Sequence, residues 1–346
     1  MPALTFEAEI TPGMRAVEVA ELARLAEEAG FDRVGISDVV FWPDPFVLLG
    51  VVAAATRRVR IGPMVTNPYT RHPAVLAGAV AAVHDASDGR AFLGIGVGAG
   101  LEPLGETYPR PVRRLREAIE AIAWLLTGEE VHLEGETLRI DGARMTGPVA
   151  PVPIAIGTRS PQVIRLAGEV ADIALLGGRY LSPATIADWR TWLAEGADRV
   201  GRDVSEVEIA PRLTLCVSRD GDRARRSVKR YVAHYVALLR PADLDLDPAW
   251  LARVEAALAR SAGWYFATDR RDDPELDTLI GDDLVGRFAI AGTPDECADL
   301  ARAALALGFT SASMNLAAPL GGTLHAGLRE TLEGAGDVLA ALRAGG

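Results

Sequence analysis

Short apolar segments rich in β-branched residues alternate with helical segments along almost the whole chain. Many of these segments are apolar throughout, which is typical of parallel strands that are covered on both faces. Eight strands are predicted, at residues 4–10, 33–38, 59–65, 91–97, 152–157, 172–177, 207–217 and 311–317. Strict alternation with eight strands predicts an α/β fold of the closed (β/α)8 TIM-barrel type, and an open doubly wound sheet is the alternative.

Two stretches interrupt this alternation, near residues 129–150 and 241–283. The first contains a run at 131–140 that reads as a β-hairpin with a Glu-Gly turn. The second follows a long helical segment, and we expect it to cap the barrel mouth or to cover an interface. No linker rich in glycine, serine or proline separates two parts of the chain. We therefore expect a single domain over residues 1–346 that carries these two insertions.

Composition excludes several classes of protein. A formal net charge of −11 argues against nucleic-acid binding and suits a cytoplasmic protein. The two cysteines, Cys216 and Cys297, lie far apart, so neither a disulfide framework nor a zinc ribbon is expected. The five histidines form no HxH or HExxH pair, so no metal site is expected. No apolar run approaches the ~18 residues of a membrane span.

Carboxylates stand near the ends of the first two predicted strands, where a TIM barrel keeps its functional side chains. Period-two alternation places Glu7 and Glu9 on one face of the first strand, with Glu9 nearer its end. Carboxylates inside a barrel must be partnered or protonated, and a raised pKa suits a proton donor. We expect Glu9 to be functional and Glu7 to be scaffold, and the alternative is that both pair with arginines. Asp38 is expected in the site, with a turn-capping role as the alternative.

The third predicted strand ends in a compact polar turn, TNPYTRHP at residues 66–73. This turn supplies hydroxyls, an amide, an aromatic ring and a cation within a few residues. Glycines at 94, 96, 98 and 100 remove side chains from the fourth strand and the turn after it. A bare backbone permits the close approach of a flat ring or a phosphate, although small residues also serve strand packing.

Glycine-rich turns also follow the fifth and sixth strands, as Gly157-Thr158-Arg159 and Gly177-Gly178. Backbone N–H groups and a cation ahead of a helix can hold an anion, although ordinary helix caps have the same composition. Because the two turns belong to neighbouring strands, together they predict a phosphate site.

Three stretches of sequence resemble a known family. They are residues 26–38, which hold AEEAGFD and Ser37-Asp38, residues 66–75, which read TNPYTRHPAV, and residues 88–96, which read DGRAFLGIG. The chain resembles the luciferase-like monooxygenase superfamily, and within it the deazaflavin-dependent branch that includes methylenetetrahydromethanopterin reductase. The resemblance spans most of the chain and is strongest before residue 180.

This resemblance implies a luciferase-like barrel that binds coenzyme F420, or alternatively FMN, at its C-terminal mouth, usually as a homodimer. It implies Glu9 as a proton donor and Asp38 as a residue that faces the cofactor. Around the ring it places Met64, Val65, Thr66 and Asn67, with a non-proline cis peptide bond between the first two. For the rest of the cofactor it places Gly96, Gly98, Gly157, Thr158, Arg159, Gly177 and Gly178. Val39 stands where many relatives have a histidine base.

The expected function is an F420-dependent oxidoreductase that transfers a hydride between the deazaflavin and a small organic substrate. An FMN-dependent monooxygenase that uses dioxygen is the first alternative. A cofactor-free barrel, either a lyase or a binding protein for a phosphorylated molecule, is the second.

Overall fold

The computed structural model describes residues 4–105, 107–178, 180–260 and 272–344. Its parallel strands form a ring in the order β3-β2-β1-β11-β9-β8-β7-β4. Parallel bridges from Ile61 to Ala91 and from Thr66 to Ile95 join the two ends of this row and close the barrel. The eight predicted strands and the TIM-barrel fold are therefore confirmed. The strands are β1 (Thr5–Ile10), β2 (Arg33–Ile36), β3 (Arg60–Pro63), β4 (Leu93–Ile95), β7 (Ile154–Thr158), β8 (Ile173–Leu176), β9 (Glu208–Val217) and β11 (Ser311–Leu316).

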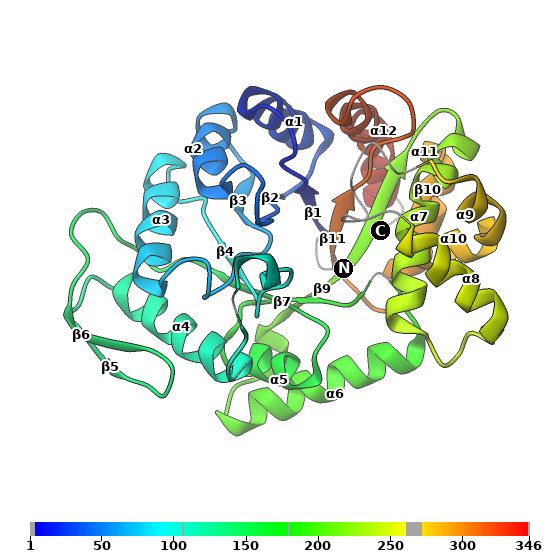
Figure 1. Ribbon diagram of the computed structural model, residues 1–346. Helices are drawn as coiled ribbons and strands as arrows, with labels where there is room; N and C mark the ends of the chain where they lie inside the picture. Colours follow the sequence, from blue (N-terminus) through cyan, green and yellow to red (C-terminus); the bar gives the residue numbers. More distant parts are fainter. Residues whose placement is uncertain (1–3, 106, 179, 261–271, 345–346) are drawn as a thin grey trace.

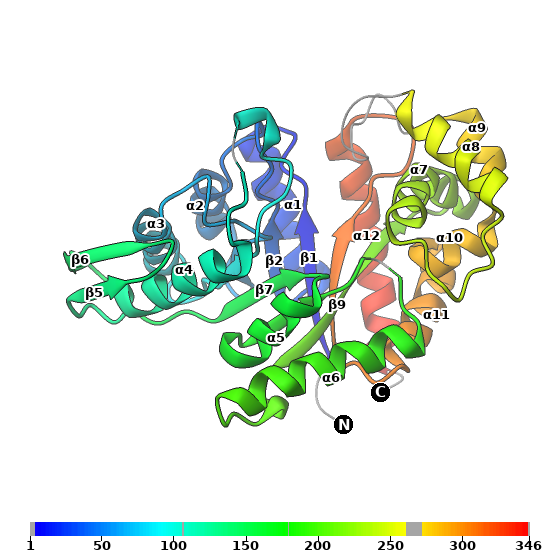
Figure 2. The same cartoon turned by 60° about the horizontal axis from the view of Figure 1, so that its bottom comes forward.

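Helices surround the barrel, as Figures 1 and 2 show. They are α1 (Ala16–Ala29), α2 (Pro45–Ala55), α3 (Pro73–Ala86), α4 (Pro111–Leu125), α5 (Pro161–Val170), α6 (Pro183–Arg199), α11 (Pro294–Leu305) and α12 (Leu324–Ala344). Many begin with a proline, whose missing N–H has no partner to lose there. The carboxylate of Asp44 caps α2, and Gly30 ends α1 with a φ of 97°. In the described part of the chain, none of the helices is long and apolar enough to span a bilayer.

The first interruption is the predicted hairpin. Strand β5 (Val131–Glu134) pairs antiparallel with β6 (Arg139–Ala143) and extends beside α4, away from the barrel (Figure 1). The buried Glu117 of α4 holds its turn, because the carboxylate accepts hydrogen bonds from the backbone N–H groups of residues 136–138. A hydrogen-bonded carboxylate thus fixes the insertion to the barrel wall.

The second interruption belongs to a group of helices packed outside β9. The described elements of this group are α7 (Gly221–Leu239), which precedes the interruption, α8 (Pro248–Ala259), α9 (Pro274–Leu279), α10 (Asp282–Phe288) and β10 (Ile290–Gly292). They share an apolar core that includes Val232, Val254 and Phe288. Strand β10, which the sequence did not indicate, pairs with the end of β9. Residues 261–271 of this insertion lie outside the described residues, and the assignment of the chain to a single domain stays a prediction.

The inside of the barrel is divided into an apolar half and a polar half. The apolar half is formed by Met64, Phe92, Ala155, Ile173, Leu175 and Ala210. The polar half comes from β1, β2, β9 and β11, whose inward positions carry Glu7, Glu9, Arg33, Arg212, Ser311 and Ser313. Since side chains alternate along a strand, every second residue of these strands faces the interior. The charged groups of the polar half lead up to the C-terminal mouth.

Candidate active site

A cavity of about 420 Å³ opens at the C-terminal mouth of the barrel. The strand ends and the turns after them form its floor and sides, and α7 forms one wall. Most of the residues expected in the site line this cavity, namely Glu9, Asp38, Met64, Val65, Asn67, Gly96, Gly98, Gly157, Thr158, Arg159 and Gly177. Thr66 and Gly178 do not. The structure therefore brings residues from six separate strand ends together at one place.

Bare backbone shapes the floor beneath the mouth. The Met64–Val65 peptide bond is cis, at the position that the family resemblance implied. A Cβ added to Gly157 would lie 2.9 Å from Cγ1 of Val65, so only glycine leaves Val65 in its place. Gly35 makes room for Met64 in the same way, because a Cβ there would lie 1.9 Å from the Met64 Cγ. A flat ligand can therefore rest on this floor without meeting side chains from the surrounding strands.

Glu9 reaches the cavity as a paired carboxylate. Its Oε1 accepts a hydrogen bond from the Ser37 hydroxyl at 2.9 Å, and its Oε2 forms an ion pair with Arg212. The sequence analysis missed Arg212, whose signal was its place in an apolar strand, two residues from Ala210 on the inward face. These contacts hold the Glu9 carboxylate at the cavity, with a cation fixed beside it.

Glu7 lies deeper in the barrel and has no exposed surface. Burial raises the pKa of its carboxyl, and the nearby charge of Arg33 opposes this rise. Arg33 Nε stands 3.4 Å from Glu7 Oε2, but the same guanidinium binds Glu208, with Nη1 3.0 Å from Oε2. The interpretation that both carboxylates pair with arginines is therefore correct for Glu9 and incomplete for Glu7.

Asp38 lines the cavity and is held from two sides. Its Oδ2 accepts the Thr66 hydroxyl at 2.7 Å and Nη1 of Arg71 at 2.8 Å. The backbone N–H and C=O of Thr66 are also used, by Gly94 and Gly96 of the neighbouring strand end. The Thr66 side chain is buried against Asp38 and does not line the cavity, so it positions this carboxylate. Its contact with the cofactor ring stays a prediction.

Asn67 stands at the edge of the same floor. Its amide oxygen accepts hydrogen bonds from the backbone N–H groups of Tyr69 and Thr70, at 3.0 and 2.9 Å, and so closes the polar turn. This arrangement fixes the orientation of the amide. Its NH2 group is the part that can donate into the cavity.

The two glycine-rich turns meet at one side of the cavity. Thr158 accepts a hydrogen bond from the Ser160 backbone N–H at 2.9 Å, just ahead of α5, and Gly177 adopts a φ of 104°. Gly178 does not line the cavity as expected, since a Cβ there would meet Leu239 at 2.9 Å. Its role is to let the end of α7 pack closely. The remaining groups offer N–H donors to an anion.

Helix α7 supplies a wall that sequence reasoning missed, made of His234, Tyr235 and Leu238. Burial lowers the pKa of His234, and the charges of Arg159 and Arg230 lower it further, so this imidazole is neutral near pH 7. Only a long helical segment was visible in the sequence at this place. The part of the barrel that this helix contacts depends on tertiary packing, which the sequence does not show.

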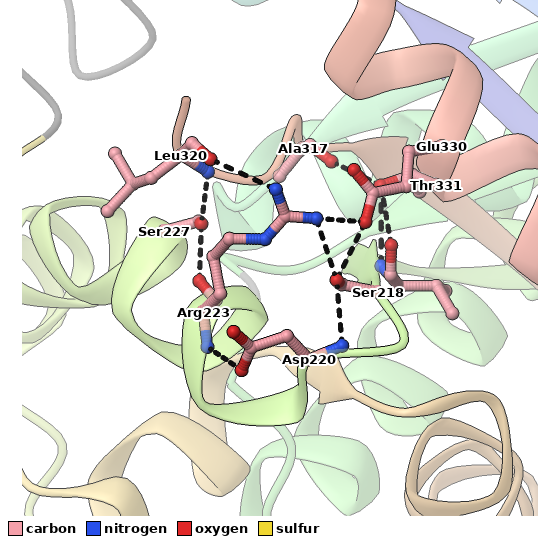
Figure 3. A network of polar contacts seen from close by, with 9 residues as sticks. Ser218, Asp220, Arg223, Ser227, Ala317, Leu320, Glu330 and Thr331 are labelled. Carbon is pink, nitrogen blue, oxygen red and sulfur yellow. Dashed lines mark hydrogen bonds and ion pairs between the residues drawn. The ribbon is translucent and has the colours of Figure 1, made fainter. Parts of the chain in front are cut away.

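Polar contacts fix α7 against the turn after β11 (Figure 3). The Ser227 hydroxyl accepts a hydrogen bond from the Leu320 backbone N–H at 2.7 Å, and Arg223 forms an ion pair with Glu330 of α12. Ser218 also donates to Glu330, at 2.7 Å. These contacts join the start of α7 to α12 and to the turn after β11.

Metal-ligand chemistry is not indicated here. Across residues 4–344, apart from the short gaps in the description, no group of three His, Cys, Asp or Glu side chains is arranged to hold a metal ion.

Comparisons with known proteins agree on one family. The model of the luciferase-like monooxygenase family matches residues 3–311. The chain is 32% identical to the 5,10-methylenetetrahydromethanopterin reductase of Methanolobus tindarius, over 89% of this chain and 92% of that protein. It is 33% identical to the F420-dependent glucose-6-phosphate dehydrogenase of Nakamurella multipartita, over 84% of each chain.

Solved structures share the fold. The coenzyme F420-dependent tetrahydromethanopterin reductase of Methanopyrus kandleri superposes with a TM-score of 0.76 at 24% identity, covering 96% of this chain and 97% of that one. An F420-dependent secondary alcohol dehydrogenase, solved in complex with an F420–acetone adduct, gives 0.74 at 20% identity, with 98% and 99% covered. At these identities the likeness concerns the fold.

Proposed function

The chain belongs to the luciferase-like monooxygenase family, and we propose that it is an F420-dependent oxidoreductase that transfers a hydride between the deazaflavin and a small organic substrate. The observation that carries this proposal is the bare floor that Gly96 and Gly157 leave around Val65, in a chain about one third identical to F420-dependent enzymes. FMN-dependent proteins share the fold at lower identity, such as a type II Baeyer–Villiger monooxygenase from Pseudomonas putida at 20%.

The cavity fits a deazaflavin by the space that its glycines leave. A Cβ on Gly96 would lie 2.9 Å from the Gly157 carbonyl oxygen, so neither strand end carries a side chain toward the floor. Val65 would support the ring, and the NH2 group of Asn67 would donate to its edge. Gly98, Gly157, Thr158, Arg159 and Gly177 would hold the tail and its phosphate, as N–H, hydroxyl and guanidinium donors. When bound, the cofactor supplies or accepts the hydride.

The protein's own contribution is to exclude water and to handle the proton that accompanies the hydride. Glu9, held by Ser37 and Arg212, is the group that exchanges this proton with the substrate. Asp38, held by Thr66 and Arg71, would face the cofactor or substrate from the turn after β2. Both carboxylates are pre-positioned by cations, so they need no rearrangement during the reaction.

Titration with F420 and, separately, with FMN tests this proposal, with absorbance as the readout of binding. We expect F420 to bind and FMN not to promote oxygen consumption. A Glu9→Gln variant should retain F420 but lose about 10²-fold or more in turnover. FMN binding with oxygen uptake would favour the monooxygenase, and failure to bind either cofactor would favour a cofactor-free barrel.

The same proposal includes a homodimer in the cytoplasm. Helices α2 and α3 lie side by side on the outside of the barrel (Figure 1). Both expose apolar side chains. Val47 is 68% exposed and Val75 is 59% exposed. A second copy of the chain would cover this face, because two-fold pairing of one apolar patch buries it on both partners.

A further inference from the structure

A group of buried polar atoms lies directly beneath the cavity without well-formed hydrogen bonds, although Arg33 and Ser313 both act on Glu7. It consists of both carboxylate oxygens of Glu7, the Ser313 hydroxyl and Nε of Arg33. They are neighbours by strand register, since Glu7 stands beside Arg33 on β2 and beside Ser313 on β11. Buried polar groups are normally satisfied, so a cluster of them inside a barrel calls for a physical explanation.

The charges around Glu7 explain why its carboxylate, unlike those of Glu9 and Glu208, has no close cation of its own. Arg33 binds Glu208 and Arg212 binds Glu9, so the two guanidiniums near Glu7 already have carboxylate partners. Glu7 is the third carboxylate beside two buried cations, and it is the one with no exposed surface.

Arg60 is exposed at the base of the barrel, and its charge acts on Glu208. A fully buried carboxylate that shares its cations with two other carboxylates takes up a proton more readily, and burial accordingly raises the pKa of Glu7.

We propose that Glu7 holds a proton in reserve for Glu9 and recharges it during turnover. This inference rests on the proposed function, because it concerns the proton that Glu9 exchanges with the substrate. Glu9 is ion-paired with Arg212 at rest, whereas Glu7 lies two residues before it on the same face of β1, about 7 Å along the strand. The two carboxyl groups therefore differ in charge although they share one face.

In the direction of substrate reduction, the Glu7 O–H bond breaks and a Glu9 O–H bond forms, with a buried water carrying the proton across the gap between the two carboxyl groups. The Glu9 O–H bond then breaks as the proton passes to the substrate atom next to the carbon that receives the hydride. Glu7 is left as a carboxylate near Arg33 until it regains a proton from solvent. No electrons move in these steps, and the ring proton lost when the deazaflavin is oxidised balances the proton taken up.

A row of polar side chains connects Glu7 to solvent at the base of the barrel. Ser311 and Ser313 are successive inward positions of β11, and the Ser311 hydroxyl accepts from Arg33 at 3.1 Å. Glu208 stands below them with a side chain that is 30% exposed, at the edge of a pit of about 890 Å³. Hydroxyls and a solvent-facing carboxylate are groups through which a proton can return to Glu7, with buried water where the gaps are wide enough.

The test compares wild type with Glu7→Gln, which keeps the shape of a protonated glutamate but cannot release its proton. In the protein without cofactor, wild type should lose stability as the pH rises above about 4.3 through the raised pKa of Glu7, and Glu7→Gln should lack this loss. Infrared spectra should show a protonated carboxyl band that is absent from Glu7→Gln and present in Glu9→Gln. If wild type and Glu7→Gln show the same pH dependence of stability and the same infrared spectrum, Glu7 holds no proton and the inference fails.

With cofactor, Glu7→Gln should bind F420 as wild type does while kcat falls about tenfold and the solvent isotope effect rises. Ser313→Ala serves as a second variant with a smaller change in the core, and it should lower kcat in the same direction. Unchanged kcat and isotope effect in both variants would overturn the relay and leave the proposed function intact. Absence of hydride transfer in wild type would instead overturn the proposed function, and the relay with it.

Discussion

The guanidinium of Arg71 binds the carboxylate of Asp38, with Nη1 2.8 Å from Oδ2. The side chains are 19% and 10% exposed, so this ion pair is largely shielded from water. The other end of the guanidinium binds Asp44, which caps α2. One side chain of the polar turn after β3 therefore positions a cavity carboxylate and the start of a helix at the same time.

Replacement of Arg71 by alanine should remove both its contact with Asp38 and its contact with Asp44. Asp38 would keep only the Thr66 hydroxyl, and we expect the free energy of unfolding to fall by about 2 kcal/mol because a shielded carboxylate loses its cation. Affinity for F420 should fall as well. Denaturant unfolding and cofactor titration measure the two effects. Arg110→Ala is the matched control, since the Arg110–Glu136 pair is exposed on both sides. Equal losses of unfolding free energy and of F420 affinity in the two variants would contradict the role given to Arg71.

The barrel could be predicted from the sequence because its signals are local. Apolar runs of strand length, separated by helical segments, specify a parallel β/α alternation whatever the details of packing. The glycines at 157 and 177 were visible for the same reason, since each marks a turn after a strand. The cis bond at Met64–Val65 came only from family resemblance, because no pattern of residue types encodes it.

Other parts of the site depend on contacts between distant segments. Arg212 pairs with a carboxylate 203 residues away, and nothing local in β9 indicates that partner. The approach of His234 to the mouth depends on how α7 packs against the turn after β11. Strand β10 has three residues and exists because β9 continues beyond β8. Period-two alternation shows which face Glu7 and Glu9 occupy but not which cation lies opposite each of them.

The floor of the cavity should be sensitive to a single methyl group. Gly157→Ala would place Cβ 2.9 Å from Cγ1 of Val65, so Val65 must shift. We expect a loss of about 1–3 kcal/mol in unfolding free energy and a drop in F420 affinity of about tenfold or more. Calorimetry and cofactor titration measure these quantities.

Gly286→Ala provides the control, because Gly286 lies within α10 and its nearest neighbour, Leu300, would be 3.8 Å from the new Cβ. This change should stabilise the protein by about 0.5–1 kcal/mol and leave F420 binding unchanged. If Gly157→Ala also binds F420 as tightly as wild type, the floor does not contact the ring as proposed.

The hairpin turn should contribute stability that depends on pH. Although burial favours the neutral form, hydrogen bonds from Thr137 and from the turn backbone hold the pKa of Glu117 below its usual value. A lowered pKa in the folded state adds stability above about pH 4.3 that is lost as the pH falls through the folded pKa. Glu117→Gln should therefore be less stable than wild type at pH 7 by about 1–3 kcal/mol, with the difference shrinking toward pH 3.

The control for this change is Glu120→Gln on the same helix. Glu120 is half-exposed and its nearest cation, Arg116, stands at 3.9 Å. Thermal unfolding of the three proteins across this pH range should show a pH-dependent difference for Glu117→Gln alone. A stability difference that does not change with pH would mean that the turn depends on the packing of the Glu117 side chain rather than on its charge.

The apolar face of α2 and α3 should be the contact between two copies of the chain. Val47 and Val75 are exposed there, so a glutamate at either position removes no core packing from the monomer but places a charge in the proposed interface. Light scattering should give wild type a mass twice that of the 36.7 kDa chain, and Val47→Glu or Val75→Glu a mass near that of one chain. Val200→Glu is the matched control, since Val200 is 55% exposed at the end of α6 and should leave the mass unchanged. A wild-type mass of one chain, or dissociation by Val200→Glu as readily as by Val47→Glu, would show that this face is not the interface.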